Sequence, residues 1–353
     1  MLRAYLVAWF QILGRTRRGE DLLYVDGFAG PGEYLNYPTG SPLAAMTAAK
    51  QAIELTGTSW IAGRIHCAFI EADTDRFKHL QHRVDTFEKI ARVLTHEYCR
   101  TFTDGLVELR RDVPRPFNAQ HPLFVFIDPF GATGVPFSVV RDLLASPCSE
   151  VLINLDADGI ARIFHAGEHA AHETHLDTIF DGDEWKTLLD PTDVSGVLYR
   201  KVLELYKTKL REIKQVKYVF SFEMRTSRHG LNYYLVFGSQ HYLGLEKMKE
   251  AMKKIDQAGD YCFSDADVIQ TSLFRFDKPE LHSTGLYNAF RGKKVGYAEL
   301  RDFALNESPF TNPKSLLKDL ECEKNLIEEV KSTDTRRRKG TFNEEKLIYV
   351  KFK

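Results

Sequence analysis

Strand-like runs that alternate with helix-like segments constrain the fold of this 353-residue chain more than any other feature. Such runs include "LLYVD", "RIHCAFIEAD", "ARVLTHEY", "LFVFID" and "SEVLINLDADG". Strands separated by helical stretches form right-handed βαβ crossovers and a mainly parallel sheet. Near-continuous apolar runs such as "LFVFI" are typical of strands that are covered on both faces. We therefore predict an α/β fold built on a mostly parallel sheet.

From about residue 215 the pattern changes to two strand-like segments around a turn. "VKYVFSFEMRT" and "LNYYLVFGSQ" lie on either side of "SRHG". Two such segments joined by a short turn are typical of an antiparallel pair, and we expect this pair to close one edge of the sheet. The predicted Rossmann-like domain covers residues 1–275.

Residues 280–353 are predicted to form a second, smaller domain. "VGYAELRDFALNES" and "NPKSLLKDLECEKNLI" indicate two short helices, the second with Asn312 as N-cap and Pro313 in its first turn. "EEVKSTDTRRRKGTFNEEKLIYVKF" indicates two strands joined by a basic loop. The order of helix, helix and basic β-ribbon predicts a winged-helix-like domain.

Charge and cysteine usage exclude several classes of protein. The 48 Lys and Arg nearly balance the 49 Asp and Glu, so any affinity for nucleic acid must come from a local patch. The five cysteines form no CxxC, which argues against a structural zinc site and for a reducing compartment. No stretch approaches a membrane span, and Leu2, Leu6, Trp9 and Leu13 predict an amphipathic N-terminal helix rather than a signal peptide. We expect a soluble, cytoplasmic protein.

The glycine-rich bend after the first strand is the first candidate binding site. Ligands of open parallel sheets bind at the carboxyl ends of the strands, where "LLYVDGFAGPG" places Asp26 beside Gly27, Gly30 and Gly32. Glycines let the backbone approach a ligand closely. The spacing is not G-x-G-x-x-G, no GK[ST] follows, and Asp26 would repel a pyrophosphate. The pattern favours a cationic ligand such as S-adenosylmethionine (SAM), which has a sulfonium and an ammonium group but no phosphate.

The second and third strands supply further candidate cofactor contacts. "CAFIEAD" ends in Glu71, and an acid at the tip of a second strand can accept hydrogen bonds from both hydroxyls of a ribose. The third strand lacks a plain acidic end, so Glu97 or Tyr98 is the candidate for the adenine contact. The alternative interpretation is that Asp26 and Glu71 only cap strand ends.

The fourth strand carries the candidate for the chemistry. "LFVFIDPFG" places Asp128 at the strand tip and Phe130 two residues later. Methyl transfer to nitrogen is an in-line displacement, and its rate depends mainly on alignment. We predict that Asp128 holds the amine or ring nitrogen and that Phe130 pins a planar substrate. The alternative is that Asp128 caps the next helix and Phe130 belongs to the core.

Taken in order along the chain, these motifs resemble the three-Cys-motif partner protein family. The match comprises "YVDGFAGPG", the "GSP" that begins at Gly40, "FIEAD", "FIDPFG", "LINLDADGIAR" and "RDFALNESPFTNPKSLLKDLE", and it runs from about residue 2 to 352. The resemblance implies a Rossmann-like domain of the class I SAM-dependent methyltransferase type. It also implies a partner, a genomically neighbouring protein with three cysteines in a radical-SAM-like arrangement. The family's first helix usually has a basic lead-in, and by this resemblance we expect the sequence to begin partway into that helix.

Carried over to this sequence, the family's pattern implies a cofactor loop after the first strand and an acceptor-side wall at 128–131. Asp128 and Phe130 are the expected catalytic residues. The expected cofactor-binding residues are Asp26, Phe28, Gly30, Gly32, Glu71, Ala72, Tyr98 and Asp128.

The segment after the fifth strand contains two weaker candidates. "IFHAGEHAAHETH" holds His165, His169, His172 and His175, and the first three would share one helix face that could hold a borderline metal. We interpret this cluster as a solvated helix face or lid and predict no metal site. Arg162 is predicted to reach an acidic group of the substrate or cofactor.

The loop "TDTRRRKG" groups Arg336, Arg337, Arg338 and Lys339. At the tip of a wing they could lie along a phosphate backbone and give salt-sensitive, sequence-independent affinity. The acids of both preceding helices argue against sequence-specific DNA binding, so RNA or a partner protein is favoured. The alternative is a solvated basic turn without a function.

Together these features predict a SAM-dependent methyltransferase that modifies an amine or ring nitrogen of a nucleobase, nucleic acid or small molecule. Two alternatives stay open. One is a non-catalytic adaptor with the SAM-binding fold, which would bind nucleic acid or the three-cysteine partner. The other is a small-molecule methyltransferase whose C-terminal part serves to dimerise.

Overall fold

The computed structural model describes residues 1–33, 39–129, 134–165, 170–190, 192–225, 232–255, 262–264 and 278–353. The chain divides into two compact units, Met1–Ala251 and Met252–Lys353. The boundary predicted from composition, at residues 275–280, falls inside the second of these units. Phe130, Gly131 and His169, which the sequence singled out, lie outside the described residues.

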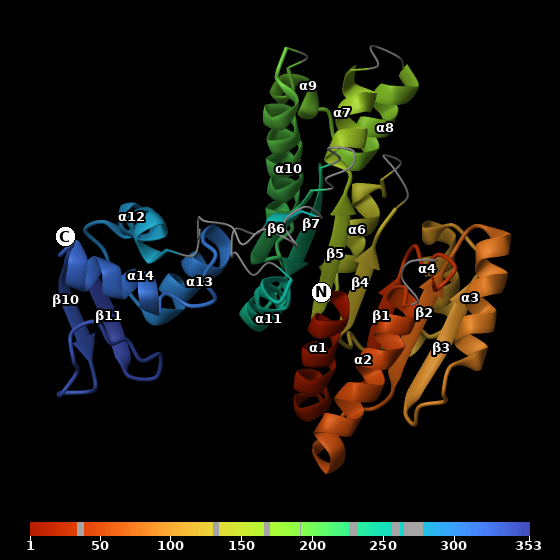
Figure 1. Ribbon diagram of the computed structural model, residues 1–353, viewed down its shortest axis with the longest axis horizontal. Helices are drawn as coiled ribbons and strands as arrows, with labels where there is room; N and C mark the ends of the chain where they lie inside the picture. Colours follow the sequence, from red (N-terminus) through yellow and green to blue (C-terminus); the bar gives the residue numbers. More distant parts are fainter. Residues whose placement is uncertain are drawn as a thin grey trace. The chain divides into compact units, whose positions relative to one another are not determined.

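The first unit is built on a mixed sheet in which seven described strands follow the order β3-β2-β1-β4-β5-β7-β6 (Figure 1). Within the part β3-β2-β1-β4-β5, each strand pairs parallel with its neighbours. In contrast, β7 pairs antiparallel with both β5 and β6. The prediction of a mostly parallel sheet with an antiparallel edge is therefore confirmed. The strands are β1 (Leu22–Asp26), β2 (Ile65–Ile70), β3 (Val93–Tyr98), β4 (Leu123–Ile127), β5 (Ser149–Leu155), β6 (Tyr218–Arg225) and β7 (Asn232–Ser239).

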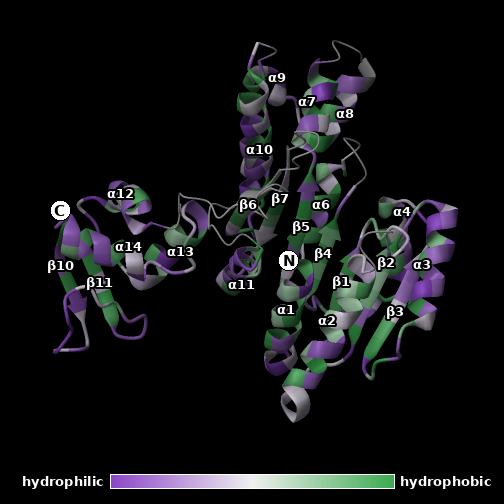
Figure 2. Ribbon diagram, viewed as in Figure 1, coloured by the Kyte–Doolittle hydropathy of each residue, from purple (hydrophilic) through white to green (hydrophobic). Residues whose placement is uncertain are grey.

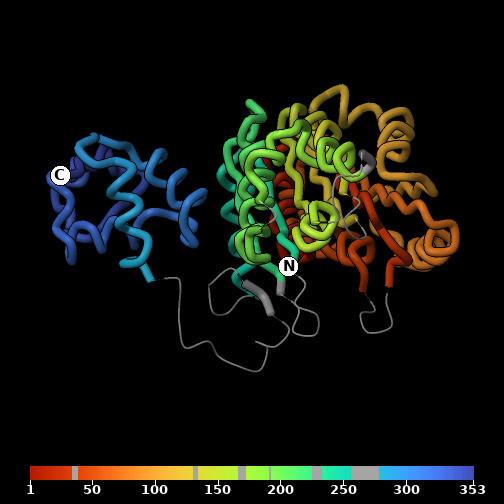
Figure 3. The backbone as a smooth tube through the Cα atoms, turned by 90° about the horizontal axis from the view of Figure 1, so that it is seen from above, coloured from red at the N-terminus to blue at the C-terminus, as the bar shows by residue number. Residues whose placement is uncertain are grey.

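Helices connect these strands and cover the sheet, as the view from above shows (Figure 3). They are α1 (Leu2–Thr16), α2 (Ser41–Thr56), the 3₁₀ turn η1 (Gly57–Ser59), α3 (Thr74–Thr86), α4 (Phe102–Asp112), α5 (Pro114–Asn118), α6 (Phe137–Ala145), α7 (Ala157–His165), α8 (Ala170–Phe180), α9 (Trp185–Leu188), α10 (Ser195–Glu212) and α11 (Tyr242–Lys253).

Alternate residues of β1 show that both faces of the sheet are buried. Leu23 and Val25 belong to a core that also includes residues of α4, α6 and α10. Tyr24 points to the other face, where it stacks on Phe124 of β4, and Phe124 in turn contacts Tyr5 of α1. The central strands are accordingly coloured as hydrophobic in Figure 2. This double burial explains why their sequences are almost continuously apolar.

The N-terminal segment forms the predicted helix, α1, with Leu6 and Trp9 buried. A buried polar network fixes this helix to the sheet, because the Tyr5 hydroxyl donates to Glu150 of β5 at 2.5 Å. The other carboxylate oxygen of Glu150 accepts a hydrogen bond from Ser239 of β7 at 2.6 Å. Among the described residues, no helix is long and apolar enough to cross a membrane.

The second unit has a hydrophobic core of its own, which includes Leu300, Leu316 and Phe352. It contains a small antiparallel sheet with the order β10-β11-β9. Sequence reasoning missed α12 and β9. The strand β9 has only two residues, which is too short to show alternation. The elements are β8 (Cys262–Ser264), α12 (Pro279–Phe290), β9 (Lys294–Val295), α13 (Tyr297–Glu307), α14 (Lys314–Lys318), its π-helical continuation η3 (Asp319–Glu323), β10 (Ile327–Ser332) and β11 (Leu347–Phe352).

Candidate functional site

The carboxyl ends of three neighbouring strands bring together the acids that the sequence singled out. Asp26 ends β1, Glu71 follows β2 and Asp128 follows β4. These strands are adjacent in the order β2-β1-β4 and run parallel, so their carboxyl ends meet at one edge of the sheet. This edge is where α/β sheets bind ligands.

A pocket of about 480 Å³ lies at this edge of the sheet, within the size range of small-molecule sites. Three residues expected to bind the cofactor, Phe28, Glu71 and Ala72, line it. Sequence reasoning missed the part of the wall that follows β3. The other lining residues are Gly27, Asp73, Arg76, Arg100, Thr101, Phe102, Thr103, Gly134, Val135 and Pro136.

Glu71 connects this pocket to the glycine-rich loop. Its side chain is 6% exposed. One carboxylate oxygen accepts a hydrogen bond from the Gly30 amide at 2.8 Å, and the other accepts one from the Asp73 amide at 2.8 Å. A carboxylate offers about four acceptor positions. Glu71 can therefore hold the loop and still accept hydrogen bonds from the hydroxyls of a ligand.

The loop after β1 depends on its glycines. Gly30 and Gly32 adopt φ angles of +60° and +82°, which residues with a Cβ atom rarely adopt. At Gly27, a Cβ atom would lie only 2.6 Å from the ring of Phe102. Phe102 also contacts Phe28, with ring centroids 5.6 Å apart. The two rings therefore form an apolar wall against the loop backbone.

Asp26 is fully buried and is not among the residues that line the pocket. Its Oδ2 accepts a hydrogen bond from the Tyr24 hydroxyl at 3.3 Å, whereas Oδ1 has no hydrogen-bond partner in the described part of the chain. Burial raises the pKa of Asp26 to about 7; the Ser41 hydroxyl opposes this rise and the carboxylate of Asp128 adds to it. A buried carboxylate with an unpaired oxygen is costly, and a nearby cation would offset that cost.

Asp128 lies at the tip of β4 beside Asn154 of β5. Its Oδ1 accepts a hydrogen bond from the Asn154 amide at 2.6 Å. Burial raises the pKa of Asp128, and this hydrogen bond opposes the rise. The side-chain oxygen of Asn154 is buried without a partner among the described residues. The pair can therefore accept hydrogen bonds from an N–H donor. Sequence reasoning missed Asn154; the signal that could have found it is its position as a polar residue within the apolar run "VLINL".

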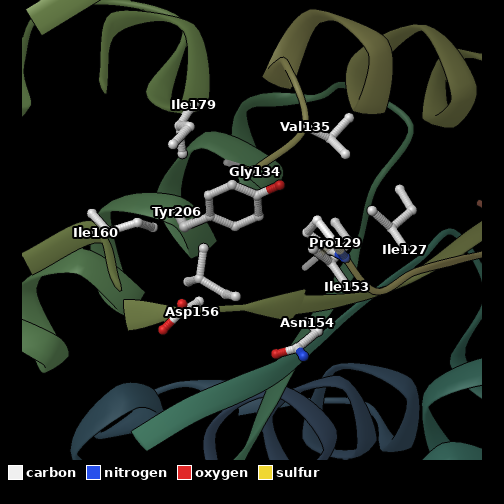
Figure 4. Close-up of a pocket in the computed structure, with 11 residues that line it drawn as sticks. Ile127, Pro129, Gly134, Val135, Ile153, Asn154, Asp156, Ile160, Ile179 and Tyr206 are labelled. Atoms are coloured by element: carbon white, nitrogen blue, oxygen red, sulfur yellow. The ribbon is translucent and has the colours of Figure 1, made fainter. Parts of the chain in front are cut away.

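A small cavity of about 20 Å³ lies next to Asn154, between the ends of β4 and β5 and helices α7, α8 and α10. Figure 4 shows Tyr206, Ile160 and Ile179 on one side of it and Asn154 on another. It shares Gly134 with the larger pocket. The volume accommodates about one water molecule, so the cavity is a gap in the packing rather than a substrate site.

Tyr98, expected to contact adenine, does not line the pocket. Its side chain is buried in the core and its hydroxyl donates to Asp112 of α4 at 3.4 Å. Glu97, the other candidate, is half-buried and does not line the pocket either. The wall on this side comes instead from Thr101, Phe102 and Thr103, because the chain turns back toward β1 only after β3 has ended.

The candidates after the fifth strand also lie outside both cavities. Arg162 of α7 has a side chain that is 68% exposed and pairs with Asp158 at 3.4 Å. His165 ends α7, whereas His172 and His175 are in α8. No group of metal-ligating side chains is present in the described ranges.

The four basic residues of the second unit differ in their surroundings. All lie in the loop between β10 and β11. Arg336, Arg338 and Lys339 are exposed. Arg337, which was also expected to contact nucleic acid, forms a bidentate ion pair with the buried carboxylate of Glu321. Arg337 is an anchor of the loop.

Comparisons with known proteins show structural similarity to SAM-dependent methyltransferases at low identity. No family model and no curated protein matches the chain. Similar solved structures include an O-methyltransferase from Bacillus cereus in complex with SAH (10% identity, 67% of this chain and 80% of that chain covered, TM-score 0.33). M. jannaschii TYW2 in complex with AdoMet matches with 10% identity, 67% and 74% coverage and a TM-score of 0.27.

A presumed methyltransferase from Porphyromonas gingivalis W83 matches with 10% identity over 66% of this chain, with a TM-score of 0.29. This chain spans only 41% of the length of that protein. At such low identity and TM-score these structures say nothing about a substrate, and the site has to be judged by its own geometry.

Proposed function

We propose that this protein is a SAM-dependent methyltransferase. One observation carries the proposal: three carboxylates lie at adjacent strand tips, at the sheet edge that holds a pocket of cofactor size. Glu71 lines the pocket, Asp26 lies next to the lining residue Gly27, and Asp128 is close enough to Asp26 to raise its pKa. Negative charge of this kind favours a sulfonium nucleoside over a phosphate-bearing one.

Each part of the pocket has a proposed role in holding the cofactor. Glu71 accepts hydrogen bonds from the ribose hydroxyls through the acceptor positions that the backbone amides leave open. Phe28 and Phe102 provide the apolar wall for the adenine ring. Asp26 and Asp128 place negative charge near the cationic sulfur. When bound, SAM supplies the electrophilic methyl group.

The acceptor side is proposed to consist of Asp128 and Asn154. Their oxygens accept hydrogen bonds from an amine or ring N–H and so orient the nitrogen toward the methyl group. The raised pKa of Asp128 also suits a group that takes up a proton as the nitrogen is methylated. The acceptor molecule is proposed to be a nucleobase, a nucleic acid or a small amine.

The finer assignments also remain proposals. The order of the motifs supports membership of the three-Cys-motif partner family, with the three-cysteine protein as a functional partner. The order α12, β9, α13, α14, β10 and β11, with β11 in the centre of the sheet, supports the winged-helix interpretation of the second unit.

Calorimetric titration with SAM and with its demethylated product, S-adenosylhomocysteine (SAH), tests the cofactor site. The wild type is expected to bind both. Asp26→Asn is expected to weaken SAM by roughly tenfold and SAH much less, because only SAM carries the sulfonium charge. Asp75→Asn is the matched control, since its side chain is 93% exposed and outside the pocket. If neither SAM nor SAH gave a heat of binding at high micromolar concentration, the proposal would be wrong.

Transfer of tritium from methyl-labelled SAM tests the catalytic role. Nucleic-acid and low-molecular-weight fractions of a cell extract serve as acceptors. Asp128→Ala is expected to keep SAM binding and to lose transfer. Equal loss of binding and transfer would show that Asp128 belongs to the cofactor site alone. Binding of SAM without transfer by the wild type to any fraction would favour the non-catalytic adaptor instead.

A further inference from the structure

One surface of the second unit groups exposed basic side chains from two elements. Lys314 and Lys318 are four residues apart in α14, so they share one side of the helix. Arg336, Arg338 and Lys339 are exposed in the loop between β10 and β11. We call these five residues the basic face.

An ion pair and backbone contacts fix the loop beside the helix, and they use none of the positive charges of the basic face. Glu321, which is 8% exposed, binds Arg337 through both carboxylate oxygens and accepts a hydrogen bond from the Gly340 amide at 2.6 Å. A Cβ atom at Gly340 would lie 2.9 Å from Cys322 Sγ and 3.2 Å from Lys318 Cγ. The backbone of the loop therefore lies directly against the helix.

The acids of this region are mostly neutralised within the unit. Besides Glu321, Asp319 is paired with Lys324 at 3.2 Å and accepts a hydrogen bond from Ser283. Asp334 is paired with Lys346 at 3.2 Å. No member of the basic face has an ion-pair partner among the described residues. Of the acids in α14 and η3, Glu323 alone is exposed, so the outer side of the helix is predominantly basic.

We propose that the basic face binds the phosphate backbone of duplex DNA without reading its sequence. Positive charges on a helix and on an adjacent loop can contact phosphates on both sides of a groove. Because these five side chains are exposed and have no ion-pair partner among the described residues, phosphates can replace their water and counterions. This inference concerns the second unit and does not depend on the methyltransferase proposal.

Duplex DNA fits this surface better than RNA or a single strand. The major groove of B-DNA admits an α-helix, whereas the major groove of A-form RNA is too narrow. Single-strand sites use aromatic side chains on which bases stack, and the basic face has none. The aromatic ring next to the loop, Phe342, is 5% exposed and covered by the guanidinium of Arg337. Among the acids that argued against sequence-specific DNA binding, Asp319 and Glu321 are turned inward and paired, whereas Glu307 and Glu323 are exposed.

The test is fluorescence anisotropy of the full chain with a labelled mixed-sequence DNA duplex at several salt concentrations. If all five residues contact phosphates, log Kobs should fall with log salt with a slope of about −4.5. Lys314→Gln with Lys318→Gln should lower the steepness by about 1.8, and so should Arg336→Gln with Arg338→Gln. Replacing all five should abolish binding.

The matched control removes two positive charges elsewhere in the same unit. Lys294 lies over the ring of Tyr349, and Lys351 is paired with Glu328 at 2.5 Å. Lys294→Gln with Lys351→Gln should leave the slope and the affinity nearly unchanged. If the control lost as much affinity for DNA as the double variants of the basic face, the proposal would be overturned, because net charge alone would then drive binding.

Duplex RNA and single-stranded DNA of the same sequence form the comparison arms. Both are expected to bind more weakly than duplex DNA. Tighter or equal binding of either, or no binding of duplex DNA at low salt, would also overturn the proposal. Heats of SAM binding measured on the same variants should stay at the wild-type value, so failure of the DNA site and failure of the cofactor site are distinguishable.

Discussion

An ionised carboxylate that is fully buried lowers the stability of the folded state unless a partner compensates its charge. Asp26 has such a position, and its pKa in the folded state is about 7 against 3.8 as the ordinary value. Between these two pH values the folded protein holds one proton more than the unfolded chain. The contribution of Asp26 to stability is therefore greatest below pH 3.8 and is lost as the pH rises through about 7.

Asp26→Asn should remove this dependence on pH. The quantity to compare is the free energy of unfolding of the variant minus that of the wild type. This difference should be about 2–3 kcal/mol larger at pH 8 than at pH 5. Chemical denaturation at both pH values measures it, with Asp75→Asn as the control. A difference between Asp26→Asn and wild type that is the same at both pH values would show that Asp26 is ionised throughout. A gain in stability together with weaker SAM binding would show that the acid is kept for its charge.

At the scale of elements, α1 is fixed to the sheet by a polar contact inside an apolar layer. Glu150 accepts hydrogen bonds from Tyr5 and Ser239, and a Cβ atom at Gly244 would lie 1.9 Å from its Oε1. Burial raises the pKa of Glu150, and both hydrogen bonds oppose the rise because they stabilise the charged form. The buried carboxylate of Glu150 therefore accepts hydrogen bonds both from helix α1 and from strand β7 of the sheet.

Tyr5→Phe should lower the free energy of unfolding by about 1–3 kcal/mol, because the buried carboxylate of Glu150 loses a hydrogen-bond donor. The loss should be larger at pH 8 than at pH 5, since the hydroxyl stabilises the ionised carboxylate. Thermal and chemical unfolding at the two pH values measure both effects. Tyr287→Phe is the control, as its hydroxyl donates to the Lys353 carbonyl at an exposed position. No difference between the two variants would contradict the assigned role of Tyr5.

At the scale of the whole molecule, the two units have separate hydrophobic cores. Units with separate cores can unfold in separate transitions. Scanning calorimetry should resolve two transitions, and SAM should raise only the one that belongs to the first unit, because a ligand stabilises the structure that binds it. Added DNA duplex should raise only the other. A single transition that both ligands raise equally would show that the units unfold together.

The sequence was sufficient to predict the elements whose pattern is local. The apolar runs predicted β1, β2, β4 and β5 because strands buried on both faces have little room for polar residues. The pair around residue 228 predicted the antiparallel edge. Glu71 and Ala72 could be placed in the pocket wall because parallel pairing brings the carboxyl ends of strands to one edge. α1 followed from one apolar helix face, with Leu6 and Trp9 buried as expected.

Only the tertiary structure decided how individual side chains are used. Phe102 became part of the pocket because Gly27 leaves room for its ring, while Tyr98 turned into the core toward Asp112. The side chain of Arg337 pairs with Glu321, sixteen residues earlier, whereas the other basic residues of the loop are exposed. Such pairings depend on which surfaces meet after the chain has folded, and a local sequence pattern carries no information about them. The sequence therefore determined where the strands end in acids, and the packing determined which of those acids, and which of the basic residues, face a ligand.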